Sequence, residues 1–324
     1  MEQVPDQPYL KDLPTVKFQP IFILGVHRSG TSILYKILVE TDSFNPVTAY
    51  HLIKYDSLLF NHYNGTESAI KQELTDTFKK AGLENRKIDS LPLTADFAEE
   101  YGFLLAKHTI NLQLIPGNID LFKDLCKKIA LISGNEKPIL LKNPYDFSNF
   151  MYIKQMFPNA KFIFIHRHPF KTLSSARKAM DVVFQGKNIY LTNLLYGFYK
   201  KMYRPLFFFP YRLVFSIFPE FGVFLFTKVT ANMTSYYLRN IDKLSPDDYC
   251  VITYEEFSKH PQQTIEMIMK SLSLPFKKTV DVPSLMKPRK SDLDPGVKKW
   301  RRLIYRMMKP YFDTFKYSPE EHLE

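Results

Sequence analysis

Short apolar runs alternate with longer amphipathic stretches along the chain. Four runs are short and almost entirely apolar, and they predict strands over residues 20–25, 138–142, 161–166 and 249–253. Stretches with apolar positions three and four residues apart predict helices over residues 31–40, 147–157, onward from 170, and 261–272. Because buried strands that alternate with helices are typical of parallel sheets, we expect an α/β fold with helices on both faces of the sheet.

Two intervals depart from this alternation. Residues 57–132 look mostly helical, with breaks at Asn64-Gly65, Leu91-Pro92 and Pro116-Gly117. Residues 202–227 are very apolar, but charged residues and prolines interrupt them, so they lack the run of about 18 apolar residues that a membrane span needs. Two interpretations of 202–227 remain open: a hairpin within an ordinary core, or a surface element that touches a membrane and admits a lipid-like acceptor.

Composition and charge narrow the function classes. With 324 residues, 45% of them apolar, the chain can bury a large core, and we expect one domain over 1–324. The net charge of +11 favours anionic partners such as a polyphosphate nucleotide or a membrane surface. No dense basic tract interleaved with aromatics precedes the C-terminal third, so nucleic acid is not the expected partner. Cys126 and Cys250 form no CxxC pair, and residues 1–17 contain no apolar leader, which predicts a cytoplasmic protein without zinc.

A glycine-bounded loop between the first strand and its helix has the features of a phosphate site. Its residues are candidate ligands through backbone N–H groups, hydroxyls and one cation: His27, Arg28, Ser29, Gly30, Thr31 and Ser32. The spacing matches the pattern G-x4-G-K-[ST], except that Thr31 stands where that pattern requires lysine. This departure argues against an ATPase or kinase, which uses the lysine on the outer phosphates. The alternative is a glycine turn without a ligand.

Residues 28–32 resemble the 5′-phosphosulfate loop of the sulfotransferase superfamily, which carries a basic residue followed by Ser-Gly-Thr-[ST]. In that family an arginine at a strand end and a serine early in the next helix hold the 3′-phosphate of the cofactor, and Arg167 and Ser175 match this pair. The resemblance implies the cofactor 3′-phosphoadenosine-5′-phosphosulfate (PAPS), its product PAP, and no metal. The alternative for Arg167 is a cap on the protein surface.

Further segments extend the resemblance to the bacterial branch of the family over residues 20–275, with 202–227 unmatched. They are Leu141-Lys142-Asn143-Pro144, Phe157–Phe162, Glu99–Phe103 and Tyr254–Phe257. The resemblance implies a P-loop-like three-layer fold with a central parallel sheet, plus an apolar, mostly helical insertion over 202–227. It also makes Tyr254 a candidate contact for the adenine, with core packing as the alternative.

Sulfuryl transfer requires stabilisation of the leaving oxygen and removal of the acceptor's proton. We expect Arg28 to act on the leaving oxygen and Lys142 on the sulfuryl oxygens. Cytosolic sulfotransferases carry a histidine two positions after the strand-end lysine, where this chain has Pro144, so the base must lie elsewhere. His51 is the first candidate, because unperturbed histidine titrates near neutrality. The reserves are Glu99, Glu100 and His108.

The C-terminal third concentrates positive charge at residues 287–290 and 298–302. Arg289-Lys290-Ser291 partly resembles a family Arg-Lys-Gly step that reaches the 3′-phosphate, and a solvated or membrane-facing basic surface is the alternative. We expect a hydrophobic alcohol, such as a sterol or other lipid, as acceptor, with peripheral contact to the inner membrane surface. The alternatives are a carbohydrate acceptor and a non-catalytic, membrane-associated relative that binds nucleotide.

Overall fold

The computed structural model describes residues 4–83, 93–184, 219–278, 280–286 and 292–320. The strands are β1 (Pro20–Leu24), β2 (Asn45–Pro46), β3 (Ile139–Lys142), β4 (Lys161–His166) and β5 (Tyr249–Thr253). The α-helices are α1 (Thr31–Glu40), α2 (Ala49–Ile53), α3 (Leu58–Tyr63), α4 (Glu67–Lys80), α5 (Gly102–Thr109), α6 (Ile119–Ser133), α7 (Phe150–Met156), α8 (Pro169–Phe184), α12 (Pro219–Asn240), α13 (Tyr254–Lys259), α14 (Pro261–Ser271), α15 (Val282–Leu285) and α16 (Pro295–Thr314). Short 3-10 turns occur at Gln7–Asp12, Tyr55–Ser57, Pro144–Ser148, Ile241–Lys243 and Pro246–Asp248.

The five strands form one parallel sheet in the order β2-β3-β1-β4-β5. The register sets Ile23 of β1 beside Lys142 of β3, and His166 of β4 beside Thr253 of β5. The carboxyl ends of β1, β3, β4 and β5 therefore lie along one edge. In an open parallel sheet, this edge is where ligands bind.

Both faces of the sheet are buried. Phe22 and Leu24 of β1 lie in one hydrophobic cluster with residues of α6 and α7, whereas Ile21 and Ile23 lie in another with residues of α1 and α14. Because successive side chains of a strand point to opposite faces, a strand that is covered twice must be apolar throughout. This requirement explains the continuous apolar runs from which the strands were predicted.

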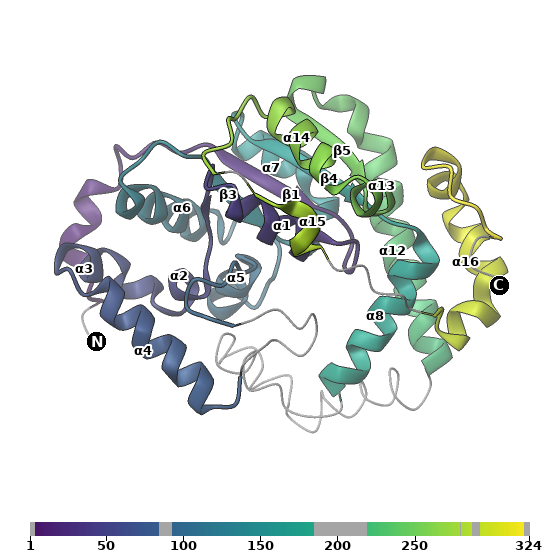
Figure 1. Cartoon of the computed structure of the whole chain (residues 1–324), viewed down its shortest axis with the longest axis horizontal. Coiled ribbons are helices and arrows are strands. Elements are labelled where there is room, and N and C mark those ends of the chain that lie inside the picture. The colour runs from purple at the N-terminus through teal and green to yellow at the C-terminus, as the bar shows by residue number, and fades with distance from the viewer. Residues whose placement is uncertain (1–3, 84–92, 185–218, 279, 287–291, 321–324) are drawn as a thin grey trace.

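Helices α8, α12 and α16 pack together beside the sheet, around a third cluster that includes Leu173, Val223 and Ile304 (Figure 1). The apolar segment 202–227 falls within the described part only from residue 219, where it forms the first turns of α12. Residues 202–218 lie outside the described residues, so their role stays a prediction. None of the described helices is both long and apolar enough to cross a membrane.

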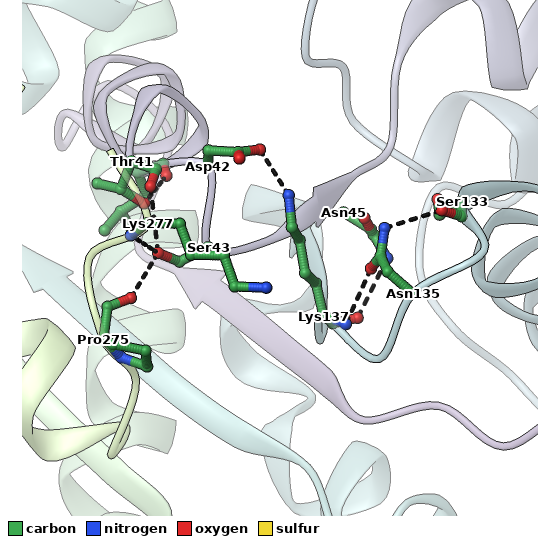
Figure 2. A network of polar contacts seen from close by, with 10 residues as sticks. Thr41, Asp42, Ser43, Asn45, Ser133, Asn135, Lys137, Pro275 and Lys277 are labelled. Atoms are coloured by element: carbon green, nitrogen blue, oxygen red, sulfur yellow. Dashed lines mark hydrogen bonds and ion pairs between the residues drawn. The ribbon is translucent and has the colours of Figure 1, made fainter. Parts of the chain in front are cut away.

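A polar network closes the opposite edge of the sheet, where β2 and β3 begin (Figure 2). The Ser43 hydroxyl donates to the Pro275 carbonyl at 2.7 Å, and Asn45 Nδ2 donates to Asn135 Oδ1 at 3.0 Å. Lys137 pairs with Asp42 in the same network. These bonds fix the turn after α1 to the segments that follow α6 and α14.

The expected α/β class is confirmed, and the four predicted strands are present. β2 was not predicted, because two residues are too few for a periodic signal. Pro46 lies in this strand at the edge of the sheet, where a missing N–H breaks no internal ladder. The helix expected over 147–157 begins instead at Phe150, after the 3-10 turn.

Candidate functional site

The loop between β1 and α1 is tightly packed against the next strand and the helix after β5. A Cβ atom on Gly30 would come within 2.4 Å of the Tyr254 ring, and Gly30 has a φ of +104°, so only glycine fits there. Gly30 is also the N-cap residue of α1, so it has no side chain to cover the first N–H groups of the helix. Those donors and the helix dipole are suited to an anion.

The loop side chains are not equivalent. Ser29 is fully buried, and its Oγ lies against Gly25 beneath the loop, so it would serve a ligand through its backbone. Thr31 and Ser32 occupy the first turn of α1, where their hydroxyls lie beside the helix end. Arg28 adopts a φ of +71°, a left-handed conformation that is uncommon for a residue with a side chain and often marks a functional turn.

The structure brings Arg28, Arg167, Ser175 and Tyr254 together. Arg28 Nε donates to Ser175 Oγ at 3.1 Å, and Arg167 Nη1 donates to the Arg28 carbonyl at 3.0 Å. The Arg167 guanidinium lies 4.2 Å from the centre of the Tyr254 ring, a cation–π contact. Arg167 Nε is buried and has no hydrogen-bond partner among the described residues. A buried, unsatisfied guanidinium N–H fits an anionic ligand.

The position of Arg28 differs from the expectation in one respect. The sequence analysis assigned Arg28 to the leaving oxygen and Ser175 to the 3′-phosphate, at the other end of the nucleotide. In the structure these two side chains are hydrogen bonded to each other. Arg28 therefore connects the two halves of the site.

Lys142 lies at the end of β3 and is almost completely buried. Its Nζ forms an ion pair with Glu100 Oε1 at 2.7 Å and donates to Ser32 Oγ at 3.0 Å. The His27 ring contacts Tyr145 edge to face, with centroids 4.4 Å apart. Burial lowers the pKa of His27, the charge of Glu100 raises it, and Lys142 and Arg28 lower it further. Glu100, one of the reserve bases, is thus joined to the phosphate loop through a lysine.

A buried carboxylate that sequence reasoning missed holds this arrangement in place. Asp146 accepts hydrogen bonds from the Tyr101 hydroxyl at 2.6 Å, from Asn143 Nδ2 and Asn149 Nδ2 at 2.8 Å each, and from the Leu114 N–H at 3.0 Å. Burial raises its pKa, while these bonds act in the opposite direction. Asp146 thereby ties the residue after Glu100 to the residue after Lys142.

The other candidate bases lie in different surroundings. His51 is buried in a capping box at the start of α2, where its Nδ1 accepts from the Thr48 N–H at 3.1 Å. Burial, assisted by the charge of Lys71, lowers the pKa of His51 to about 3. His108 is exposed near the other end of α5, against the Tyr55 ring, and Glu99 Oε1 accepts the Glu100 N–H. Of the four candidates, the described contacts join only Glu100 to Lys142.

The residues on either side of Arg167 are fixed by the C-terminal helix. The Tyr311 hydroxyl lies 3.0 Å from His166 Nδ1 and also hydrogen bonds to the Arg167 backbone. The next residue, His168, accepts the Phe170 N–H and contacts the Ser318 carbonyl at 3.0 Å. Sequence reasoning missed these contacts, which position Arg167 without involving its guanidinium.

A related bond reaches Tyr254. Glu255 accepts the His168 N–H at 3.0 Å and the Tyr317 hydroxyl at 3.2 Å. The C-terminal helix thus holds the cation–π pair from both sides. Arg289 and Lys290, the expected C-terminal contacts to the 3′-phosphate, lie outside the described residues. Lys299 pairs instead with Glu220 of α12 at 2.7 Å.

We expect Tyr311→Phe to lower the free energy of unfolding by about 1–3 kcal/mol, because the buried Arg167 N–H and His166 Nδ1 lose their partner. Urea unfolding measures the change. Tyr305→Phe, six residues earlier on α16, is the matched control and should stay within about 0.5 kcal/mol of wild type. Equal losses in the two variants would contradict a specific role for the Tyr311 hydroxyl.

We expect His51→Gln to make stability less sensitive to acid. The folded-state pKa of about 3 lies below the ordinary value of 6.5, so unfolding takes up a proton and stability falls as the pH drops from 6.5 towards 3. Glutamine keeps the capping box but cannot titrate, so the variant should lose up to about 1.4 kcal/mol less per pH unit in this window. Urea unfolding at pH 8 and at acid pH tests this, and parallel pH profiles for variant and wild type would contradict it.

Comparisons with known proteins agree with this geometry. A model described as "Sulfotransferase family" matches residues 20–204, more than half of the chain. The fold is similar to that of sulfotransferase STF9 from Mycobacterium avium, with a TM-score of 0.62 at 13% identity over 96% of this chain and 81% of that one. It is also similar to sulfotransferase STF1 from Mycobacterium tuberculosis H37Rv, with a TM-score of 0.55 at 12% identity over 94% and 80%. A search of curated proteins finds no match. The chain belongs to the sulfotransferase family.

Proposed function

We propose that this protein transfers a sulfuryl group from PAPS to an acceptor hydroxyl. The observation that carries the proposal is the joining of two cationic groups at one sheet edge. Lys142 with Ser32 and Glu100 forms one group, and Arg28 with Arg167 and Ser175 forms the other. A nucleotide with phosphate at both ends of its ribose needs both groups, because each dianionic phosphate is best bound by cations and helix-end donors.

The 5′ end of the nucleotide fits the amino end of α1. The N–H groups after Gly30 and the hydroxyls of Thr31 and Ser32 supply donors, and Lys142 adds a positive charge at Ser32. The 3′-phosphate fits the second group, in which Arg167 has a buried N–H without a partner and Ser175 begins its hydrogen bond from Arg28. Tyr254, which covers Gly30, is suited to lie near the adenine.

We assign Glu100 as the base in place of His51. Glu100 is mostly buried beside Lys142, whereas the Nδ1 lone pair of His51 is occupied by a backbone N–H. In the proposed step the acceptor oxygen bonds to sulfur while the bond from sulfur to the 5′-phosphate oxygen breaks. The acceptor's proton passes to a Glu100 oxygen, and the electron pair of the broken bond stays on PAP. Lys142 holds the sulfuryl oxygens, and the α1 donors with Arg28 stabilise the leaving phosphate.

For the acceptor we propose a hydrophobic alcohol, such as a sterol or another lipid. The support is the apolar sequence of residues 202–227, whose last turns begin α12 and expose Phe221 and Phe224. A carbohydrate acceptor is the second candidate, because the polar residues around Glu100 are equally suited to a sugar hydroxyl. Screening both classes with PAPS separates the two.

We expect PAP to raise the unfolding temperature, because a ligand that binds only the folded state stabilises it by about 2.7 kcal/mol at 100 times its Kd. Arg167→Ala should abolish the shift. Arg239→Ala, an exposed arginine on α12, is the matched control and should keep it. Stabilisation by ATP with none by PAP would overturn the proposal in favour of a nucleotide kinase.

Glu100→Gln should lower kcat by roughly 100-fold to 10,000-fold while PAP still binds, because the amide cannot accept the proton. His51→Gln should keep kcat near the wild-type value. Initial rates with PAPS and an acceptor from the screen, together with thermal unfolding to confirm folding, measure both effects. The reverse pattern would return the base to His51, and PAP binding with no transfer to any acceptor would indicate a non-catalytic relative.

A further inference from the structure

Helices α12 and α16 lie side by side and begin at the same end (Figure 1). Glu220 in the first turn of α12 pairs with Lys299 of α16 at 2.7 Å, and the Val223 side chain lies 3.3 Å from the position of a Cβ on Gly296. The other ends of both helices reach the sheet, where Tyr237 and Tyr311 contact His166. The amino ends of the two helices therefore point away from the catalytic edge.

The first turns of α12 expose large apolar side chains. Phe221 is 50% exposed, Phe224 is 37% exposed, and their rings stack with centroids 6.4 Å apart. Val229, two turns later, is 55% exposed. Val223 and Thr227 occupy the opposite face of the same helix and are buried. Single exposed apolar residues are ordinary, but a row on one helix face marks a surface that meets another apolar phase.

The solvent face of α16 is cationic. Its exposed positions at successive turns are Lys298, Lys299, Arg302, Arg306 and Lys309. The buried face of the helix is apolar, with Val297, Ile304 and Met308. On α12, the exposed Lys228 lies between the apolar positions 224 and 229. Apolar side chains flanked by a basic stripe are typical of proteins that bind at the interface of an anionic bilayer.

We propose that the amino ends of α12 and α16 form a docking surface for a negatively charged lipid bilayer. This surface consists of Phe221, Phe224, Lys228, Lys298 and Arg302. The two rings enter the interface, and the cations lie at the level of the headgroups. Charge alone would suit RNA equally well, but the exposed ring pair beside the cations favours lipid. The proposal is independent of PAPS chemistry, because none of these residues belongs to the nucleotide site.

Vesicle flotation of the full chain tests the docking surface. Binding is expected with vesicles of phosphatidylcholine and about 30% phosphatidylglycerol, and it should weaken as salt rises from about 0.05 to 0.5 M. The double variant Phe221→Ser, Phe224→Ser should reduce binding roughly tenfold or more. The variant Lys298→Glu, Arg302→Glu should also reduce it, and should remove most of its salt dependence.

The matched control is Phe60→Ser, Met267→Ser, which removes two exposed apolar side chains from α3 and α14 and should bind vesicles like wild type. Absence of flotation, equal binding to pure phosphatidylcholine, or no effect of the serine variant would overturn the proposal. Loss of a dimer in the serine variant would assign the face to a second copy, and RNA binding without vesicle binding would assign it to nucleic acid. PAP-induced stabilisation, measured on every variant, keeps these outcomes distinct from failure of the proposed function.

Discussion

The parallel sheet, buried on both faces, is the constraint on which the site depends. Helices cover each face of β1, β3 and β4, so these strands consist almost entirely of apolar residues, and polar side chains enter where the strands end. The strand register then brings the residues after Leu24, Leu141 and His166 to one edge. Chemistry collects at this edge because the interior of the sheet excludes it.

Two different devices hold the polar residues at that edge. Lys142 is buried, and a buried ammonium is costly unless it is paired and hydrogen bonded. Glu100 and Ser32 supply those partners, and Asp146 fixes the two segments that carry Lys142 and Glu100. Arg167 is held through its backbone and its neighbours, which leaves its guanidinium available to stack on Tyr254. The first device orders charges directly, and the second orders the chain around a charge.

Much of the fold and part of the site could be predicted from local sequence. Apolar runs predicted four strands, and the glycine spacing predicted the loop, because both signals lie within a few residues. Asp146 and Tyr311 escaped prediction because their partners are 45 and 145 residues away. His51 shows a different limit. Its ordinary pKa made it the first candidate base, but burial governs the actual value, and burial is a property of the tertiary structure. Its capping partner, Thr48, was visible three residues earlier.

The hydrogen bond between Arg28 and Ser175 has a consequence for selectivity. It closes the site upon itself, so a nucleotide must replace this bond in order to enter. A ligand with a 3′-phosphate returns two charge-assisted bonds for the one it displaces, whereas a ligand with a bare 3′-hydroxyl returns at most a neutral one. Abundant nucleotides without that phosphate therefore face an entry threshold set by the empty protein itself. Discrimination of this kind arises from what the binding site does in the absence of its ligand.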